Sequence, residues 1–341
     1  MYDVIGDVHG QYEELHQLLT TKLGYIYSES DRVFVHPDGR KPVFIGDYID
    51  RGPKNRKVVE LVRSMEQTGL AYAIMGNHEF NAVQWATPDR LNPGEFQRVH
   101  TEDNRRQHRT FLAEMEPDPD FYRSTIAWFK SLPLFLKLDD NNFVHACWYP
   151  PAIQSLQNAG CMTRGGRLTE AGWNAAADPE SPHYAPIQLL LKGPEEDLPN
   201  GLMYLDTHGH ERRQARVAWW RDNATTFDEA YASLPSYFPF MKRSYTKPEG
   251  ETVYDDIRRQ LAAMPEGERI FIGHIAESGD PQLLSKKVCC VDYEGPHRLA
   301  AYRIGTEPGL DARNFTWVDN SPLAAHPAPA GRHALYGALI A

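Results

Sequence analysis

The chain has 341 residues, of which 41% are hydrophobic and 24% are charged, a composition typical of a globular protein with a sizeable core. The net charge of −10 argues against non-specific binding to nucleic acid, and no apolar run is long enough to span a bilayer, so we expect no membrane partner. Met1 leads directly into an apolar strand without a basic region, which argues against a signal peptide, and the four cysteines form neither a disulfide framework nor a CxxC pair. We therefore expect a cytoplasmic protein.

Strands and helices alternate in the first 80 residues. We expect strands over 2–5, 42–45 and 71–75, because each is a short apolar run that stops at a glycine. Apolar residues at helical spacing predict a helix over 11–23 and a second helix that begins at Pro53. Apolar strands that alternate with helices indicate an α/β protein whose sheet is covered on both faces.

The same pattern returns late in the chain. Residues 134–138 and 143–145 predict a hairpin around a polar turn at 139–142. Further strands are expected over 269–272, 288–293 and 299–304.

The segment 148–268 differs from both flanks, because prolines, tryptophans and tyrosines are dense there and periodicity is poor. We interpret it as a cap inserted into one domain that spans residues 1–320. Residues 321–341 are rich in Ala and Pro and predict a flexible tail. The aromatic residues of the cap either line one wall of a cleft or form the cap's own core. They include Trp148, Trp173, Trp219 and Trp220.

Polar side chains follow the ends of five predicted strands. Because the carboxyl ends of strands in an α/β sheet meet at one edge, we expect these side chains to converge. Carboxylate, imidazole and amide oxygen are ligands for a divalent metal such as manganese, iron or zinc. The converging residues are Asp7, His9, Asp47, Asn77, His145 and His274.

A simpler interpretation applies to each position taken alone. A Gly-Asp pair at a strand end is usually a turn, and a single histidine is more often packed than bound to metal. We assign that simpler role to His16, His36, His100, His183 and His297. Other site motifs are missing, since the chain has no GxxxxGK[ST], GxGxxG, HExxH or GxSxG sequence.

Three motifs carry a family resemblance: Gly6-Asp7-Val8-His9-Gly10, Gly46-Asp47-Tyr48-Ile49-Asp50-Arg51-Gly52 and Gly76-Asn77-His78-Glu79, followed by His145 and His274. The chain resembles the calcineurin-like metallophosphoesterases, in the branch of serine/threonine protein phosphatases and symmetrical diadenosine tetraphosphatases. The segment from His36 to Gly76 also resembles the phosphatase module of bacterial polynucleotide kinase-phosphatase. The resemblance implies a four-layer α/β fold, with two packed mixed sheets flanked by helices and an inserted cap.

The resemblance also implies a site for two divalent metal ions, for which manganese is our expectation and iron or zinc are alternatives. Asp7 and His9 would bind the first ion, and Asp47 would bridge both. The second ion would be held by Asn77, His145 and His274. Such a pair of ions holds the phosphate oxygens and turns a bridging water into the attacking hydroxide.

The catalytic residues that the resemblance implies lie in the second and third motifs. His78 would be the general acid that protonates the departing oxygen, and Asp50 would orient its ring. Arg51 would grip the non-bridging phosphate oxygens. We expect Glu79 to be structural and to bond nearby loop amides.

A further cation from the inserted segment normally completes the phosphate grip in this family. Lys192 is our first candidate for this substrate-binding role, and the alternatives are Arg212, Arg213 and Arg216. A second basic stretch, residues 98–109, could grip a polyphosphate or an oligonucleotide end. We favour the solvated face of a helix, because acidic residues interrupt it.

The sequence therefore predicts a metal-dependent phosphatase that hydrolyses phosphate esters or anhydrides. We expect a small phosphorylated or nucleotide substrate, including dinucleoside polyphosphates. A phosphoprotein is the alternative partner, because the GNHE and DRG motifs resemble those of protein phosphatases. A non-catalytic metal-binding module is a third hypothesis, which loss of metal ligands would favour, and none of the six is missing.

Overall fold

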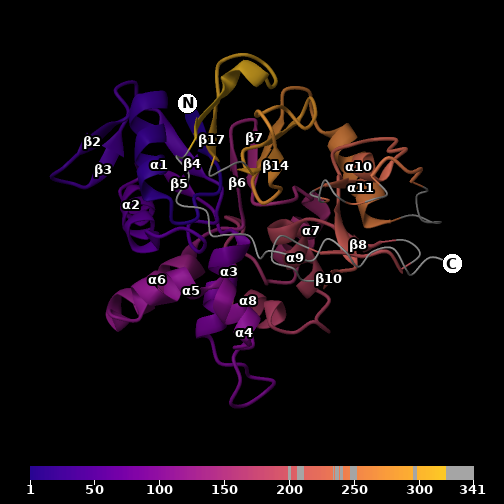
Figure 1. The fold of residues 1–341 in the computed structure, drawn as a ribbon, viewed down its shortest axis with the longest axis horizontal. Coiled ribbons are helices and arrows are strands. Elements are labelled where there is room, and N and C mark those ends of the chain that lie inside the picture. The colour runs from indigo at the N-terminus through magenta and orange to yellow at the C-terminus, as the bar shows by residue number, and fades with distance from the viewer. Residues whose placement is uncertain are drawn as a thin grey trace, which may run out of the picture.

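The computed structural model describes residues 1–198, 201–205, 211–232, 234, 238, 241–245, 252–294 and 298–319. The predicted tail at 321–341 and His297 lie outside the described residues. Figure 1 shows the chain as a ribbon, with the first strands in indigo and the late strands β14 (Glu277–Ser278) and β17 (Arg298–Arg303) in orange and yellow.

The first sheet has five strands in the order β18-β17-β1-β4-β5. β1, β4 and β5 are parallel, and β17 is antiparallel to β1 and to β18, so the sheet is mixed. Val4 of β1 lies opposite Val43 of β4. The strands are β1 (Tyr2–Ile5), β4 (Lys41–Phe44), β5 (Tyr72–Ala73), β17 (Arg298–Arg303) and β18 (Phe315–Asp319).

The second sheet has four strands in the order β15-β13-β7-β6. β13 is parallel to both of its neighbours, and β6 is antiparallel to β7. The strands are β6 (Phe135–Leu138), β7 (Asn141–Val144), β13 (Arg269–Ile272) and β15 (Val288–Cys290).

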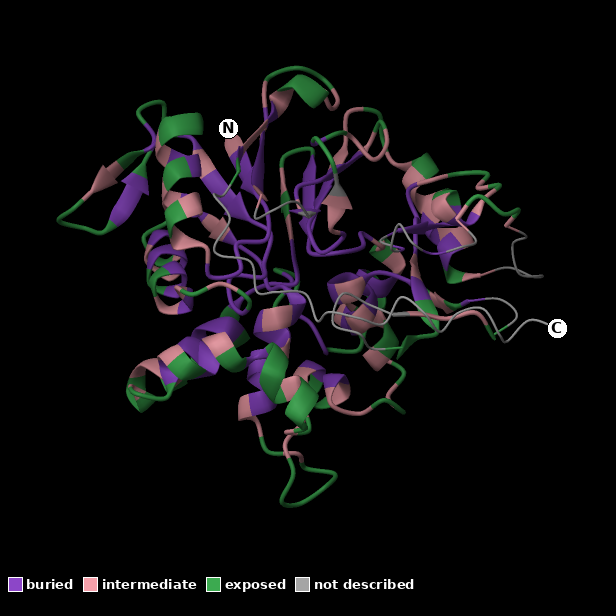
Figure 2. Cartoon of the chain, viewed as in Figure 1, coloured by how far each residue is buried: buried purple, intermediate pink, exposed green. Residues whose placement is uncertain are grey.

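The two sheets pack face to face through an apolar layer. Successive side chains of a strand point to opposite faces, so Val4 joins this layer while Ile5 faces away from it. Phe143 of β7 stacks on Phe271 of β13 with ring centroids 5.3 Å apart. Phe271 in turn meets Tyr302 of β17 in the other sheet at 5.4 Å, and Figure 2 shows the central strands as buried.

Helices cover the outer faces of both sheets and join a larger apolar cluster. Ile5 lies in this cluster with Leu15 of α1 (Tyr12–Gln17) and Val58 of α2 (Asn55–Gln67). On the second sheet, Val144 lies in it with Leu190 of α9 (Tyr184–Lys192). The order helix, sheet, sheet, helix confirms the predicted four-layer fold.

Four helices follow β5 and pack below the sheets in Figure 1. Their starts are encoded locally, because the Thr101 side chain caps α4 by accepting from the Asn104 amide. Asp118 caps α6 in the same way, and Pro119 occupies its first turn. The four are α3 (Asn77–Ala86), α4 (Glu102–Gln107), α5 (Arg109–Met115) and α6 (Pro119–Ser131).

Residues 148–268 lie between β7 and β13 and contain helices and short strands. Three of the strands form a small sheet in the order β12-β11-β8. None of the described helices of the chain combines the length and apolar character that crossing a membrane requires. The elements of this segment are α7 (Pro150–Asn158), α8 (Glu170–Ala176), α9, β8 (Glu195–Asp197), β9 (Tyr204–Leu205), β10 (Glu211–Arg212), β11 (Gln214–Val217), α10 (Phe227–Ala230), β12 (Tyr231–Ala232) and α11 (Val253–Ala263). The boundaries of the domain and of its cap stay predictions.

The strand and helix predictions need five corrections. The helix expected to begin at Pro53 begins at Asn55. The helix expected over 11–23 turns into a π-helix, η1, at Leu18–Lys22, and the strand expected over 71–75 is only β5. The strand expected over 288–293 breaks after Cys290 and resumes as β16 (Tyr293–Glu294), which pairs with β14 (Glu277–Ser278). The hairpin turn is tighter than predicted, because β7 begins at Asn141. Elements without a prediction include β2 (Ile26–Ser28), β3 (Val33–Val35), η3 (Ala312–Asn314) and β18.

Candidate metal centre

The carboxyl ends of β1, β4, β5, β7 and β13 meet where the edges of the two sheets adjoin. His145 Nδ1 donates to the Ile45 carbonyl at 2.8 Å, which links β7 to the strand end of the other sheet. The Asp7 carboxylate accepts from the His274 amide at 3.1 Å and makes a second link. These contacts cross between the sheets, so side chains far apart in sequence face one small volume.

Asp47 lies at the centre of this volume. Its Oδ2 is 3.7 Å from His9 Nε2, and its Oδ1 is 3.4 Å from His145 Nε2. Asn77 Oδ1 lies 3.1 Å from the same His145 nitrogen, and the His145 and His274 rings are 5.1 Å apart. The structure therefore brings together all six residues that the sequence predicts as ligands.

Several ligand atoms in the volume have no partner among the described residues. His9 Nδ1 donates to the Ile49 carbonyl at 2.8 Å, so the neutral ring turns an unprotonated Nε2 toward Asp47. His274 Nε2 and Asp7 Oδ1 are also buried without a hydrogen bond. Buried polar atoms are normally satisfied, so converging lone pairs of this kind fit a cation. The residues present thus fit a pair of divalent ions.

The charges of two predicted ligands agree with that fit, whereas for His145 burial would lower the pKa but Asp47 raises it above its usual value. Burial and the nearby Arg51 lower the pKa of His9, and burial and Arg216 lower the pKa of His274, so both rings are neutral, as metal ligands must be. Burial by itself would raise the pKa of Asp47, but His145 and His78 hold that pKa well below its usual range. Asp47 is therefore ionised.

Asp292, between β15 and β16, adds a carboxyl group that the sequence analysis did not identify. Burial, followed by the charge of Asp292, raises the pKa of Asp7. Burial also raises the pKa of Asp292. Two neighbouring carboxylates repel each other unless a proton or a cation lies near them, which again favours a cation here.

Backbone strain is concentrated at this edge. Eight non-glycine residues in the described part of the chain have positive φ, and five of them are predicted site residues. Such conformations cost free energy and cluster where function requires them. The five are His9, Asp47, Asp50, Arg51 and His274.

Two glycines allow the backbone to approach the carboxylates closely. A Cβ atom at Gly76 would lie 2.2 Å from Asp47 Oδ1, and a Cβ at Gly273 would lie 2.2 Å from Asp7 Oδ1. No side chain fits at either position without displacing a predicted ligand.

Glu79 has the structural role that the sequence predicts. Its Oε2 accepts from the amides of Asp47 at 2.8 Å and Gly76 at 3.0 Å, and its Oε1 accepts from Tyr48 at 2.8 Å. Burial, followed by the charge of Asp47, raises the pKa of Glu79 to about 7. Glu79 thus ties two of the ligand-bearing loops together, and the prediction is confirmed.

His78 and Asp50 form a pair beside the ligands. His78 Nδ1 donates to Asp50 Oδ2 at 2.6 Å, and His78 Nε2 faces the centre at 3.8 Å from Asp47 Oδ2. The second oxygen of Asp50 accepts from Nδ1 of a buried histidine, His108, at 2.8 Å. His78 Nε2 is therefore the atom that can exchange a proton with a bound substrate.

The cations differ in their distance from the centre. Arg51 is exposed and close enough to His9 and His78 to affect the pKa of each ring. Arg216 Nη1 lies 3.5 Å from the His274 carbonyl oxygen, and its Nε is buried without a hydrogen bond, 3.8 Å from Glu195 Oε1. Lys192, at the end of α9, is partly buried, and burial lowers its pKa.

The two remaining arginine candidates lie farther out. Arg212 and Arg213 are exposed, and Arg213 lies 3.9 Å from Glu211. Of the three alternatives to Lys192, the structure places Arg216 beside a predicted ligand.

Basic residues 98–109 are not simply a solvated helix face. Most of α4 is exposed, but His108 is 4% exposed and bonds Asp50, so the prediction is wrong for this residue. Arg98 is also partly buried, and burial lowers its pKa although the charge of Asp50 opposes the shift. Nothing in the local pattern marks His108, since four arginines surround it in the sequence.

Three of the histidines predicted to be packed, His16, His36 and His100, make such contacts in the described part of the chain. His16 meets Phe34 edge to face at 5.1 Å, and His100 stacks on Trp85 at 3.7 Å. His36 Nε2 lies 3.1 Å from the Leu23 carbonyl oxygen, and His183 precedes α9.

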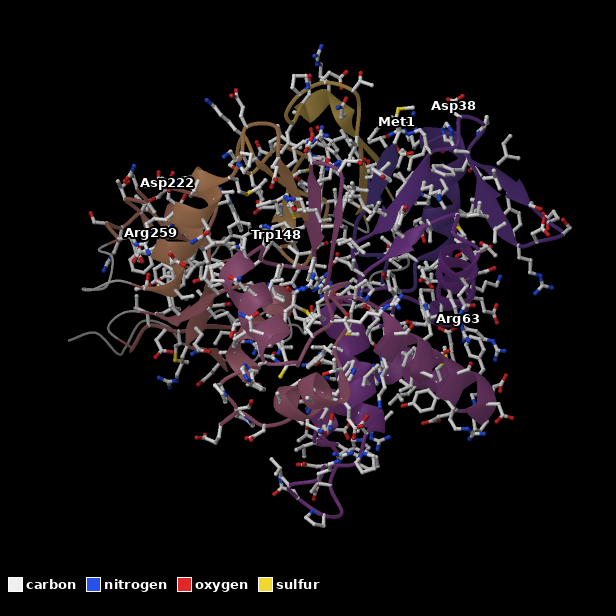
Figure 3. The ribbon with its side chains drawn as sticks, turned by 180° about the vertical axis from the view of Figure 1, so that it is seen from behind. Met1, Asp38, Arg63, Trp148, Asp222 and Arg259 are labelled. Atoms are coloured by element: carbon white, nitrogen blue, oxygen red, sulfur yellow. The ribbon has the colours of Figure 1, made fainter. Side chains whose placement is uncertain are left out.

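The tryptophans of the inserted segment belong to the core. Trp148 is 9% exposed and packs edge to face on Phe135, while Trp219 and Trp220 are more deeply buried. Figure 3 places Trp148 near the middle of the molecule and Asp222 at its edge. Trp173 stacks on Phe80 at 5.5 Å. Burial therefore favours the core interpretation over a stacking wall for these rings.

The fold and this edge together define a metallophosphoesterase. The sequence profile of the calcineurin-like phosphoesterases matches residues 2–278, and the chain belongs to this family. Phosphoesterases of this kind depend on two metal ions. Among His, Cys, Asp and Glu side chains, the described residues contain two groups of candidate ligands that share Asp47: one adds His9 and His78, and the other adds His145 and His274.

One relative is an asymmetrical bis(5'-nucleosyl)-tetraphosphatase, PrpE, of Anoxybacillus flavithermus. It is 49% identical over 78 residues, which are 23% of this chain and 31% of the relative. The chain thus matches about three tenths of the length of such relatives. The motifs resemble those of symmetrical tetraphosphatases, whereas this relative is named as an asymmetrical one.

Two solved structures are similar over most of the chain. A protein serine/threonine phosphatase from Saccharomyces cerevisiae is 16% identical with a TM-score of 0.45. The match covers 94% of this chain and 80% of the yeast chain. A cold-active protein-tyrosine phosphatase from Shewanella is 17% identical with a TM-score of 0.43. The match covers 88% of this chain and 74% of the phosphatase chain.

Proposed function

We propose that this protein is a metal-dependent phosphoesterase that hydrolyses a small phosphorylated or nucleotide compound, including dinucleoside polyphosphates. The observation that carries the proposal is the convergence of unpaired ligand atoms around Asp47, beside a histidine whose Nε2 is free to donate a proton. The tetraphosphatase relative supports the nucleotide class.

The residue roles follow from this arrangement. Asp7, His9 and Asp47 would hold one ion, and Asp47 would hold the second with the other three predicted ligands, which are Asn77, His145 and His274. When bound, such ions act as Lewis acids that neutralise phosphate oxygens and lower the pKa of water.

His78 donates its Nε2 proton to the departing oxygen, because its Nδ1 proton is held by Asp50. Arg51 contacts the non-bridging oxygens with its planar guanidinium group. A proton delivered in this way matters most when the departing oxygen is a poor leaving group.

The cations beyond the centre support a substrate with more than one phosphate. Burial lowers the pKa of Lys192, the charge of Glu195 opposes this shift, and the nearby charges of Arg98 and Arg216 add to it. Glu195 is the acidic neighbour of the group, 3.8 Å from Arg216. Cations held together with few counter-charges are stabilised by an anion, so we assign Arg216 and Lys192 to substrate phosphates.

A substrate panel tests the proposal. The manganese-loaded protein is assayed against phosphopeptides, mononucleotides, dinucleoside polyphosphates and simple aryl phosphates. We expect turnover of aryl phosphates and the highest kcat/KM on a nucleotide. Preference for phosphopeptides would support the phosphoprotein alternative, and metal binding without turnover would support a non-catalytic module.

A pair of variants tests the phosphate contacts. Arg216→Ala should raise KM for a polyphosphate by about 10-fold or more, the loss expected of a charge-assisted hydrogen bond. The exposed Arg212→Ala is the matched control and should leave KM unchanged. Equal KM values for the two variants would remove Arg216 from the substrate site. Manganese as the metal and a cytoplasmic location stay predictions from the sequence.

A further inference from the structure

His108 is a buried polar residue to which the proposed reaction gives no role. Its backbone is fully used by the helices, because its amide donates to Asn104 at 3.1 Å and its carbonyl accepts from Leu112. Its side chain is 5% exposed and makes one directional bond, from Nδ1 to Asp50 Oδ1 at 2.8 Å. Its Nε2 has no hydrogen-bond partner among the described residues.

An unpaired buried nitrogen is unfavourable, and an apolar side chain would avoid it. The ring is otherwise packed among aromatic residues, since Phe111 lies 4.8 Å and Trp85 5.9 Å from it. A side chain that only filled this space would need no nitrogen. The bond to Asp50 is therefore the contact that distinguishes histidine at this position.

Asp50 holds two histidines, one with each carboxylate oxygen. Oδ2 accepts from His78 at 2.6 Å, and Oδ1 accepts from His108. Because a carboxylate accepts but does not donate when ionised, both rings must carry their proton on Nδ1. With both oxygens bonded, the carboxylate plane cannot rotate, and the direction of the bond to His78 is fixed.

We propose that His108 is a positioning residue that holds Asp50, and through Asp50 sets the orientation of the acid His78 toward the departing oxygen. The inference rests on the proposed function, since it assigns a role in that reaction. Without His108, Asp50 retains the bond to His78 but loses the second contact that fixes its plane. The N–H bond of His78 Nε2 then points less accurately at the departing oxygen. A small misplacement of a catalytic group can lower the reaction rate substantially.

The test compares two phosphate esters that differ in leaving group. His108→Leu should lose about 10- to 100-fold in kcat on an alkyl phosphate, which needs the proton, and less than about 3-fold on nitrophenyl phosphate, which does not. The ratio of the two activities is measured in one preparation, so it does not depend on the fraction of the variant that is folded.

Two further variants separate positioning from packing. His108→Asn keeps an N–H donor near the place of Nδ1 and should restore most of the ratio. His100→Leu is the matched control, because His100 also packs on Trp85 but bonds its carbonyl at 2.9 Å rather than a site residue. It should leave the leaving-group ratio unchanged.

A double variant tests whether His108 acts through His78. In a His78→Asn background, His108→Leu should cause no further loss, because the group on which it acts is already absent. Equal losses on both esters, or a full additional loss in that background, would overturn the role of His108. A wild type inactive on both esters would contradict the proposed function itself, and this inference with it.

Discussion

The edge of the sheets and the inserted segment are built by different means. At the edge, the ligands lie within a few residues of strand ends, and strained backbone and glycine hold them together. The insertion is instead organised around one carboxylate, Glu196, which accepts hydrogen bonds from the hydroxyl groups of Tyr231, Tyr245 and Tyr254. The backbone conformation positions the residues at the edge. Hydrogen bonds between side chains from several elements hold the inserted segment together.

This difference separates function from stability. A substitution at the edge should remove activity while the apolar layers keep the protein folded. A substitution in the tyrosine cluster should lower stability while a small substrate is still hydrolysed. Substitutions at the edge test the effect on activity, and a substitution in the tyrosine cluster tests the effect on stability. The largest expected effect comes first.

Asp47→Asn should abolish turnover with any metal tried, because Asp47 faces both candidate ligand groups and its charge is removed. The measurement is hydrolysis of nitrophenyl phosphate, with the thermal midpoint recorded in parallel. Near-normal hydrolysis by the variant would show that Asp47 is not a shared ligand.

Gly273→Ala should weaken metal binding by about 10- to 100-fold, the range seen when groups that orient metal ligands are disturbed. The added Cβ would lie 2.2 Å from Asp7 Oδ1 and must displace that carboxylate. Gly165→Ala is the matched control, since its nearest neighbour is Thr163 Oγ1 at 3.9 Å. Calorimetric titration with manganese checks both, and equal affinities would mean that the close approach is unimportant.

Glu196→Gln should destabilise the folded state by about 1–3 kcal/mol, because the amide group cannot accept from all three tyrosine hydroxyls. Activity on nitrophenyl phosphate below the unfolding midpoint should change little. Urea unfolding measures the effect, with the exposed Glu180→Gln as control. A large loss of activity without a loss of stability would join the cluster to the site and break the contrast.

The four cysteine thiols should react only slowly with a thiol reagent in the folded protein. Burial raises the pKa of all four thiols, so little thiolate forms near neutral pH. We expect slow reaction with a thiol reagent in the folded protein and fast reaction in denaturant. Rapid labelling of the folded protein would show that one of these side chains is accessible.

Local sequence predicted the first three strand ends, because each of these strands and the predicted ligands after it lie within one short motif. Asp292 could not be found in this way. The run from Val288 to Tyr293 looks like one strand. Only the folded structure shows that it breaks after Cys290 and that Asp292 lies near Asp7.

His108 shows the same limit more clearly. Its partner Asp50 is 58 positions away, and its neighbours in sequence are the charged residues of a solvated helix. The local sequence of the inserted segment did not predict its hydrogen-bond cluster, since its tyrosines and Glu196 come from several elements. Periodicity predicts which face of an element is buried, but it does not predict which polar groups meet when the elements pack.

The central claim is that six converging side chains hold two metal ions. Calorimetric titration of the metal-stripped full chain with manganese tests it most directly. The account predicts two ions per chain in the wild type, and loss or strong weakening of both in Asp47→Asn, since Asp47 is shared. A wild type that binds no manganese, or a variant that binds two ions with unchanged affinity, would contradict it.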